Sequence, residues 1–228
     1  MVKFVLSSMK FKLIFLTCLL AFGAQISAQK VGVVLSGGGA SAMAHVGFLR
    51  ALEENNIPID YITGTSMGAI VGAMYCAGYS VDQIDSIVNS PEYLLMATGV
   101  IDDQYSYYFT EDEPDPGIVT IKYGGGSIIS TTLPTNLIDP VLLDYKLMEG
   151  LSQASAAANY NFDSLYIPFR CMASDIENKE QVMFDRGHLS VAVRASSTYP
   201  FYLQPIRVDG MLLYDGGLYN NFPSDVMY

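Results

Sequence analysis

The stretch Asp60-Tyr-Ile-Thr-Gly-Thr-Ser-Met-Gly68 decides the fold, because a short apolar run passes there directly into a helical pattern. Residues 60–63 are typical of a buried strand, and the glycine that follows them ends it. Small and apolar residues from Met67 to about Ala77 predict a helix. A strand that leads into a helix through so few residues needs a sharp turn, and such a turn can expose a reactive side chain.

The turn reads Gly64-Thr-Ser-Met-Gly68, which is the pattern Gly-x-Ser-x-Gly of a nucleophile elbow. In such an elbow the serine adopts a strained backbone conformation that exposes its hydroxyl. Gly64 and Gly68 leave room for the neighbouring backbone to approach. The predicted helix begins at Ser66, and its N-terminal N–H groups and dipole favour negative charge there. Ser66 is therefore the candidate nucleophile.

An earlier apolar run also leads into a helical pattern. Residues 30–35 predict a buried strand, and the glycine-rich residues 36–40 end it. From 41 to 55, apolar residues recur at three-residue steps, which predicts an amphipathic helix. Strand, helix, strand and helix at this spacing predict a parallel sheet with right-handed crossovers. We therefore expect an α/β fold, a three-layer sandwich with a mostly parallel central sheet.

Further patterns extend this fold along the chain. Helices are predicted at 80–88, 140–158 and 190–195, and strands at 118–123, 169–173, 181–184 and 210–214. Between about 98 and 134 the sequence is acidic, aromatic and interrupted by proline, and we expect an excursion over the sheet there. Its aromatic run is expected to form either a lid that faces lipid or packing around a loop. That run comprises Tyr105, Tyr107, Tyr108 and Phe109.

The base for a serine nucleophile is expected to be a carboxylate. The chain has two histidines, and both precede the best acidic candidate, whereas α/β-hydrolases place the histidine last. His45 is expected to pack or cap in the first helix, and His188 to lie at the surface. The acidic candidate is Asp215, at the C-terminal end of a predicted strand, where open α/β sheets place their sites. Partial burial would raise its pKa and favour proton acceptance from serine. Gly216 and Gly217 let backbone and substrate come close.

Gly37, Gly38 and Gly39 follow the first predicted strand and open the first helix. Their N–H groups, unobstructed by side chains, are expected to converge on a developing oxyanion. An alternative stays open, because Gly-x-Gly-x-x-Ala from Gly37 also matches a dinucleotide-binding fingerprint, with Asp60 about 20 residues further on for the ribose. This alternative accounts for neither the serine elbow nor the Asp-Gly-Gly turn.

With these three motifs in this order, the chain resembles the patatin-like phospholipases, a family that uses a Ser/Asp dyad without histidine. The resemblance implies that Ser66 is the nucleophile, that Asp215 is the base and that Gly37–Gly39 form the oxyanion loop. The stretches Arg194-Ala-Ser-Ser-Thr-Tyr-Pro200 and Asn220-Asn-Phe-Pro223 also resemble family segments on either side of that base.

The resemblance covers about residues 30–228, with some departures. The family's loop usually reads Gly-Gly-Gly-x-Arg-Gly, whereas this chain has Ser41 and Ala42 in the last two places. Family members continue beyond the last motif with another helix and strand, whereas eleven residues follow Gly217 here. We therefore expect a patatin-like acyl hydrolase domain at 29–228 that is C-terminally incomplete.

Residues 1–28 are expected to be a signal peptide. Three lysines precede the apolar run 13–22, and small residues then lead to an expected cleavage after Ala28. The alternative of a membrane anchor needs about 20 apolar residues, and this run is shorter. We therefore expect export, and the resemblance implies the bacterial periplasm, the outer membrane or the extracellular space.

Charge and composition limit the possible partners. Without residues 1–28, nine basic and 23 acidic side chains remain, a formal charge of −14. This charge argues against nucleic acid and anionic lipid, so a membrane or micelle would be contacted transiently through apolar groups. Two cysteines and two histidines at unrelated spacings argue against a structural metal site, and no cofactor is expected. Cys76 and Cys171 are expected either to be buried free thiols or to form one disulfide, which export permits.

We predict a serine acyl hydrolase of the phospholipase A or lysophospholipase kind, which cleaves lipid carboxylic esters through a Ser-Asp dyad and an acyl-enzyme. Two other classes of function stay open. One is a non-catalytic lipid- or protein-binding module on the same fold, and the other is a dinucleotide-binding protein.

Overall fold

The computed structural model describes residues 30–100, 120–124, 127–132 and 136–227. Residues Val31–Tyr228 form one compact unit. The segment 1–28, expected to be a signal peptide, lies outside the described residues. The aromatic run at 105–109, for which a lid was one expectation, also lies outside them.

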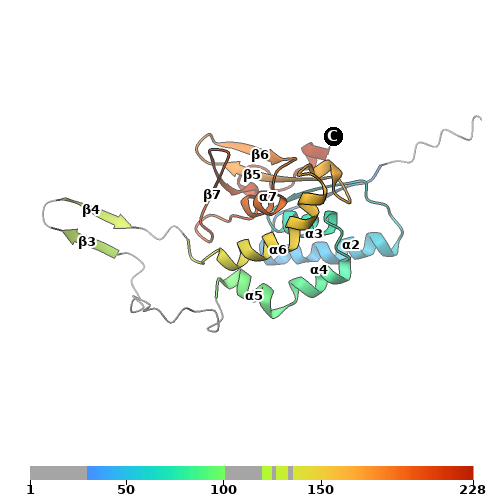
Figure 1. Cartoon of the computed structure of the whole chain (residues 1–228), viewed down its shortest axis with the longest axis horizontal. Coiled ribbons are helices and arrows are strands. Elements are labelled where there is room, and N and C mark those ends of the chain that lie inside the picture. The colour runs from blue at the N-terminus through green and yellow to red at the C-terminus, as the bar shows by residue number, and fades with distance from the viewer. Residues whose placement is uncertain (1–29, 101–119, 125–126, 133–135, 228) are drawn as a thin grey trace, which may run out of the picture. The chain divides into compact units, whose positions relative to one another are not determined.

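Strands and helices alternate through the first part of this unit (Figure 1). The strands are β1 (Gly32–Leu35), β2 (Tyr61–Thr65), β3 (Thr120–Gly124), β4 (Ser127–Thr132), β5 (Phe169–Asp175), β6 (Glu180–Phe184), β7 (Ile206–Val208) and β8 (Met211–Asp215). The helices are α2 (Ala44–Glu54), α3 (Met67–Cys76), α4 (Val81–Val88), α5 (Pro91–Thr98), α6 (Val141–Ala157) and α7 (Leu189–Ser196). Short 3-10 turns are η1 (Gly39–Met43), η3 (Phe162–Ser164), η4 (Gly216–Leu218) and η5 (Ser224–Met227). The predicted helices and strands are confirmed, and α5, β4 and β7 are additions.

The central sheet has six strands in the order β1-β2-β5-β8-β7, with β6 also paired to β5. The predicted α/β class is confirmed, but the sheet is mixed rather than mostly parallel. β1, β2 and β5 pair in parallel, whereas β6 and β8 pair antiparallel to β5, and β7 pairs antiparallel to β8. The later strands reverse direction because short turns connect them. Asp209 and Gly210, with φ of 50° and 86°, form the two-residue turn of the β7–β8 hairpin.

The strand pairing of β5 determines which strands meet along its edges. β6 pairs with residues 171–175 of β5, so β6 occupies one edge. β2 pairs with residues 169–172 of β5, and β8 pairs with residues 173–175. Both ranges overlap the residues that already pair with β6, so β2 and β8 must both lie along the other edge of β5. Because β2 is parallel to β5 and β8 is antiparallel, the C-terminal ends of β2 and β8 meet there.

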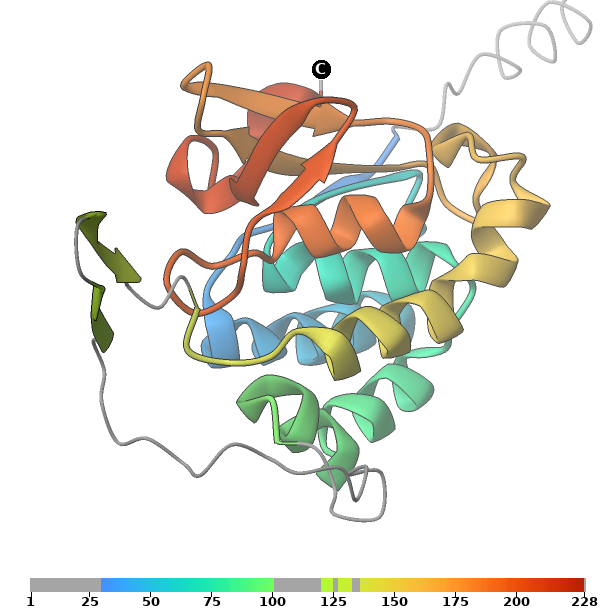
Figure 2. The same cartoon turned by 60° about the vertical axis from the view of Figure 1, so that its left-hand side comes forward.

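The long helices are stacked on one face of this sheet (Figure 2). On that face Ile62 and Phe169 lie against Gly72 of α3, where a Cβ atom would come within 3.1 Å of each of them. The side chains of Thr63 and Thr65 point to the other face, where their hydroxyls donate to the carbonyls of Pro223 at 3.2 Å and Asn220 at 2.8 Å. The sheet therefore lies between the helices and the C-terminal residues 220–227.

Both cysteines of the described residues are buried free thiols, so the alternative of a disulfide between them is wrong. Cys76 lies on α3 and Cys171 on β5, within the main apolar core. Burial raises the pKa of both thiols above the ordinary range. At neutral pH they are therefore protonated and pack as small apolar side chains.

Helix α5 begins with a signal that is readable in the sequence. The Ser90 hydroxyl accepts the N–H of Tyr93 at 3.1 Å, and Pro91 occupies the first turn. α4 begins in a similar way, with a full capping box between Ser80 and Gln83. These caps fix where two short helices start, although α5 has little periodic pattern of its own.

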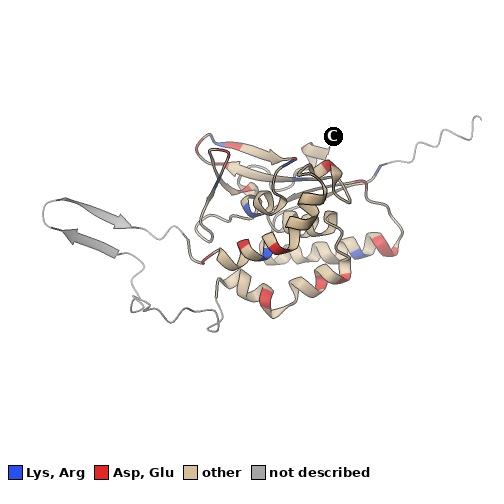
Figure 3. Cartoon of the chain, in the orientation of Figure 1, with Lys and Arg blue, Asp and Glu red and all other residues tan. Residues whose placement is uncertain are grey.

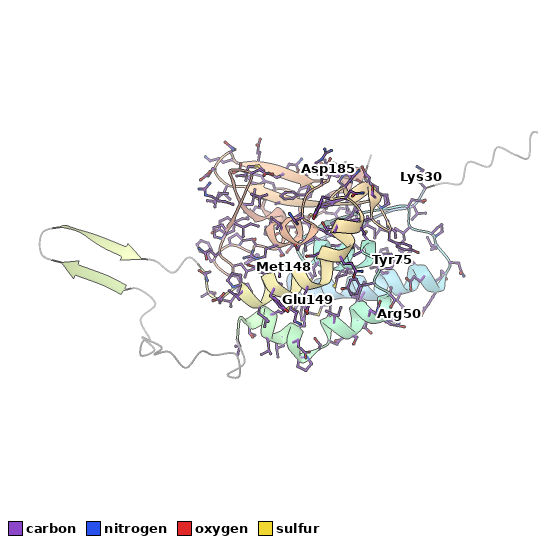
Figure 4. All side chains as sticks on the ribbon, viewed as in Figure 1. Lys30, Arg50, Tyr75, Met148, Glu149 and Asp185 are labelled. Carbon is purple, nitrogen blue, oxygen red and sulfur yellow. The ribbon has the colours of Figure 1, made fainter. Side chains whose placement is uncertain are left out.

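Surface ion pairs join α2 to α4. Arg50 of α2, which is labelled in Figure 4, forms ion pairs with Asp82 at 2.5 Å and Asp85 at 3.2 Å, both of α4. All three side chains are substantially exposed, so we expect these pairs to contribute little to stability. The buried apolar core carries most of the fold's stability instead.

Strands β3 and β4 form an antiparallel two-stranded sheet. The predicted strand at 118–123 corresponds to β3, and β4 is its hairpin partner. Among the residues that the structure describes, no helix is long and apolar enough to cross a membrane.

Candidate active site

Ser66 lies in the turn between β2 and α3 with a strained backbone, at φ 55° and ψ −123°. The glycines on either side are required by space. A Cβ atom at Gly64 would lie 2.6 Å from the carbonyl oxygen of Gly68, and one at Gly68 would lie 2.2 Å from that of Leu35. The turn therefore has the geometry that the pattern Gly-x-Ser-x-Gly predicts.

The meeting of β2 and β8 brings Asp215 to this turn. Thr65 pairs with Met172 of β5, and Asp215 pairs with Ala173, the next residue of β5. Ser66 directly follows Thr65, so the serine and the aspartate emerge at adjacent positions. The Ser66 hydroxyl donates a hydrogen bond to Oδ2 of Asp215 at 2.6 Å. Ser66 and Asp215, which lie far apart in the sequence and were each predicted from a local motif, are therefore in direct contact.

Asp215 is firmly held and largely removed from water. Its exposed fraction is 4%, and its Oδ1 accepts the N–H of Gly217 at 2.7 Å. Its main-chain carbonyl accepts the Ser174 hydroxyl at 2.8 Å. Burial raises the pKa of Asp215 above its ordinary value, while the hydrogen bonds from Ser66 and Gly217 partly oppose that shift. A carboxylate of raised pKa is a better proton acceptor than an exposed one.

The two glycines after Asp215 are also required by space. A Cβ atom at Gly216 would lie 2.2 Å from the Met172 carbonyl oxygen. A Cβ atom at Gly217 would lie 2.8 Å from Oδ1 of Asn221 and 3.0 Å from Oδ1 of Asp215. Side chains at these positions would push the chain away from β5 or crowd the carboxylate.

The glycine loop lies beside the serine, as expected, but its three N–H groups are not equivalent. A Cβ atom at Gly37 would lie 3.0 Å from Cβ of Ser66. The N–H of Gly37 donates to the Asn221 carbonyl at 3.1 Å, so the expectation that Gly37 offers an oxyanion donor is not met in this conformation. Within the described part of the chain, the N–H groups of Gly38 and Gly39 have no hydrogen-bond partner.

Asn221 is a residue that sequence reasoning did not assign to the site. Besides accepting the Gly37 N–H, it donates its side-chain Nδ2 to the Gly37 carbonyl at 3.3 Å. Asn221 thus bonds both the N–H and the carbonyl of Gly37 and holds the loop at that residue. The sequence pointed to Asn221 only through the resemblance of residues 220–223 to a family segment, and that resemblance did not assign a role to Asn221.

The histidines lie where they are expected. Nε2 of His45 on α2 is 2.9 Å from the Ser36 carbonyl oxygen, so His45 ties the helix to the end of β1. His188 is exposed and packs edge-on against the Tyr160 ring, with centroids 4.9 Å apart. Neither histidine is bonded to Ser66 or Asp215.

The dinucleotide alternative fails on the position of Asp60. Its carboxylate accepts the Val31 N–H at 2.7 Å, at the start of β1. Gly37–Gly39 follow the end of the same strand, so the carboxylate and the glycine loop lie at opposite ends of the sheet. Asp60 therefore does not face a ribose next to this loop.

An apolar pocket of about 1330 Å³ adjoins Ser66 and Asp215. Gly37, Gly38 and Gly39 line it next to the two polar residues. Its apolar lining comes from η1, α3, α5, α6 and the loop after α7, and includes Met43, Met67, Ile70, Tyr93, Leu94, Met96, Leu143, Tyr199, Tyr202 and Leu203. Asp215 is the single charged residue among the described lining residues. The pocket therefore suits a long apolar group that ends at the serine.

Metal ligands do not gather in the described ranges: no group of three or more His, Cys, Asp or Glu side chains there is placed to hold an ion. The chemistry of this site is that of a serine hydroxyl, a carboxylate and backbone N–H groups.

The sequence of the chain is similar to a known protein family and to several of its relatives. A family model described as patatin-like phospholipase matches residues 33–228. A patatin-like phospholipase domain-containing protein of Caenorhabditis elegans is 30% identical over 215 residues, which are 89% of this chain and 13% of that protein. Patatin-like phospholipase domain-containing protein 6 of Homo sapiens is 29% identical over 203 residues, 88% of this chain and 12% of that protein.

A bacterial relative and a solved structure extend the comparison. An uncharacterized NTE family protein of Mycobacterium tuberculosis is 28% identical over 207 residues, 91% of this chain and 30% of that protein. This chain thus spans less than a third of each of these three relatives. The crystal structure of VipD from Legionella pneumophila aligns with a TM-score of 0.53 and 13% identity, over 86% of this chain and 47% of that one. That similarity is one of fold.

Proposed function

The chain belongs to the patatin-like phospholipase family, and on that premise we propose that it is a serine acyl hydrolase that cleaves carboxylic ester bonds of lipids. One observation carries the proposal. The Ser66 hydroxyl donates to a buried carboxylate, Asp215, at 2.6 Å, beside an apolar pocket. Ser66 is the nucleophile and Asp215 is the base.

In the first step, Oγ of Ser66 attacks the ester carbonyl carbon while its proton passes to Oδ2 of Asp215. The hydrogen bond already joins these two atoms, so the transfer needs no intervening group. The tetrahedral intermediate then breaks its bond to the leaving alkoxide, which takes the proton from Asp215. The products of this half-reaction are a free alcohol and an acyl-enzyme on Ser66.

In the second step, a water molecule attacks the acyl-enzyme and gives a proton to Asp215. The tetrahedral intermediate breaks its bond to Oγ of Ser66, which recovers that proton, and the fatty acid leaves. Asp215 thus accepts and returns one proton in each half-reaction. Its raised pKa supports both directions, because a stronger base accepts more readily while the protonated form remains acidic.

The developing oxyanion needs donors that are already oriented. The N–H groups of Gly38 and Gly39 serve this purpose in our proposal, since both residues line the pocket beside Ser66 and neither N–H is engaged elsewhere among the described residues. The positive end of the α3 dipole adds to this stabilisation. Losing one such donor typically costs about 10²–10³ in rate.

The substrate's apolar part occupies the pocket, and the substrate is presented at a neutral or zwitterionic lipid surface. Exposed apolar side chains lie at the pocket or next to it, including Leu94, Leu137, Tyr199, Phe201 and Leu218. Acidic residues outnumber basic ones along α2, α4, α5 and α6 (Figure 3). This balance opposes binding to anionic lipid, so contact through apolar groups is favoured.

The proposal is tested by hydrolysis of a chromogenic acyl ester and of defined neutral and zwitterionic lipids. We expect Ser66→Ala and Asp215→Asn each to lower kcat by at least about 10³-fold, because each removes a group that acts in both half-reactions. Both variants should keep the wild-type circular dichroism spectrum. A folded Ser66→Ala protein that hydrolyses these esters at the wild-type rate would refute the assignment and favour a binding module on this fold.

A further inference from the structure

A short segment at the end of α7 touches both Ser66 and Asp215. The hydroxyl of Ser196, which is fully buried, accepts the Ser66 N–H at 3.0 Å. Two residues on, the main-chain carbonyl of Thr198 accepts the Asp215 N–H at 2.8 Å. The backbones of the two proposed catalytic residues are therefore held by the same piece of chain.

The bond from Ser196 acts at the strained point of the turn. Ser66 has φ 55° and ψ −123°, a conformation that side-chain-bearing residues adopt only when the surroundings impose it. Its N–H points away from the helical ladder of α3, so it needs an acceptor from another element. Ser196 supplies that acceptor, and without it a partly buried N–H would lose its hydrogen bond.

The segment is itself anchored by a buried guanidinium. Arg194 is 4% exposed and donates from Nε to Oδ1 of Asp144 on α6 at 2.5 Å. Its other nitrogens donate to the Thr198 hydroxyl at 2.5 Å and to the Gln204 carbonyl at 3.2 Å. These bonds connect the end of α7 to α6 and to the loop that follows. The acceptor for Ser66 thus belongs to a rigid part of the molecule.

We infer that Ser196 is a positioning residue for the nucleophile. It fixes the backbone of Ser66 so that the hydroxyl stays within hydrogen-bonding distance of Asp215, while it does not touch the substrate carbonyl itself. The inference rests on the proposed function. It adds a specific residue and a specific bond that the nucleophile motif and the Asp-Gly-Gly motif do not contain.

The test compares Ser196→Ala with a matched control, Ser155→Ala. Ser155 is also buried, and its hydroxyl also accepts a backbone N–H, that of Leu189 at 3.2 Å, at the opposite end of α7. Both variants lose one buried acceptor for one helix-terminal N–H, and Ser155→Ala also loses the bond from its hydroxyl to the Gly187 carbonyl at 3.3 Å. Of the two serines, Ser196 is the one that contacts Ser66. For Ser196→Ala we expect kcat to fall by about 10–10²-fold with KM nearly unchanged, because a small misplacement of a reacting group has effects of this size.

For Ser155→Ala we expect a comparable loss of thermal stability with kcat within about twofold of wild type, because the site keeps its geometry. Ser196→Cys replaces the hydroxyl with a somewhat larger thiol, which fills the space but is a weak acceptor. We expect it to lose activity like Ser196→Ala, and it covers the case in which alanine fails to fold. Hydrogen exchange of the Ser66 amide, followed by NMR, should be faster in Ser196→Ala and unchanged in Ser155→Ala.

The outcomes separate this inference from the proposed function. Folded Ser196→Ala with wild-type kcat, or an equal loss of kcat in Ser155→Ala, overturns the positioning role alone. Wild-type hydrolysis that does not depend on Ser66 overturns the proposed function and this inference together.

Discussion

Burial of Asp215 makes it a stronger base for the proposed reaction but lowers the stability of the folded protein. The residue is 4% exposed, and its carboxylate has two short hydrogen bonds and no bonded cation among the described residues. Burial raises its pKa, which means that the folded state binds the proton more tightly than the unfolded chain does. Ionisation of Asp215 therefore costs stability. In our proposal this cost is tolerated because a serine nucleophile without a histidine needs a strong carboxylate base.

The raised pKa of Asp215 predicts how the effect of Asp215→Asn on stability changes with pH. Because the folded pKa is raised, the wild-type contribution is most favourable below the unfolded pKa of about 3.9 and is lost as the pH rises through the folded pKa. Asparagine carries no charge at any of these pH values and can still accept the Gly217 N–H. We expect the melting temperature of Asp215→Asn to equal or exceed that of wild type at pH 7, with the difference shrinking toward pH 4.

Thermal unfolding at a series of pH values checks this, with Asp175→Asn as the control. Burial alone would raise the pKa of Asp175, but the hydrogen bonds from Asn178 and the backbone together lower it below its ordinary value. Its substitution should therefore destabilise the protein at pH 7, the opposite sign. A melting temperature of Asp215→Asn that lies well below wild type at pH 7 would contradict our account of the buried carboxylate.

At the scale of elements, close approach between α3 and β1 is what keeps the nucleophile turn in place. Gly68, on the first turn of α3, lies against the backbone of Leu35, and a Cβ atom would be only 2.2 Å from its carbonyl oxygen. Because the obstacle is backbone within the sheet, no side-chain movement relieves it. The helix would have to move away from β1, and the Ser66 turn would move with it.

Gly68→Ala is accordingly expected to destabilise the protein by about 1–3 kcal/mol, through overpacking, and to lower activity. Gly47→Ala is the matched control, since Gly47 also lies in a helix but has no atom within 4 Å of the added methyl group. It should stabilise the protein by about 0.5–1 kcal/mol, because alanine is the better helix former. Urea unfolding measures both, and equal effects of the two substitutions would refute the packing argument.

Some helices and strands can be predicted from the sequence alone, and others cannot. The strands and helices from β1 to α3 can be predicted because their apolar residues recur regularly. The glycines in this part of the chain mark the turns between strand and helix. β7 is three residues long and follows Pro205, so its pattern is too short to read as a strand. The sheet is mixed partly because of the Asp209-Gly210 turn between β7 and β8, and this turn can be recognised only once β7 is known to be a strand.

Contacts between distant segments are the part that local patterns do not contain. Motifs point to Ser66 and Asp215 separately, whereas their contact depends on β2 and β8 sharing one edge of β5 in a particular register. The bonds of Ser196 and Asn221 depend on the same register. Both residues lie in stretches that resemble family segments, 194–200 and 220–223, but that resemblance assigned no role to either residue.

At the scale of the whole molecule, one compact unit carries the sheet, the turn and the pocket. The helices supply the apolar lining, while the ends of the strands supply the polar groups. The segment expected to direct export, residues 1–28, lies outside the described residues, so export stays a prediction. The family relationship and the site geometry together support the proposal of lipid ester hydrolysis by this unit.

The most direct measurement of the central claim is labelling by a fluorophosphonate, which reacts with activated serines, followed by peptide mass spectrometry. Our account predicts one adduct, on Ser66, with a labelling rate that falls by at least about 10²-fold in Asp215→Asn because the base is lost. Labelling of another residue, or an equal rate in wild type and Asp215→Asn, would contradict it.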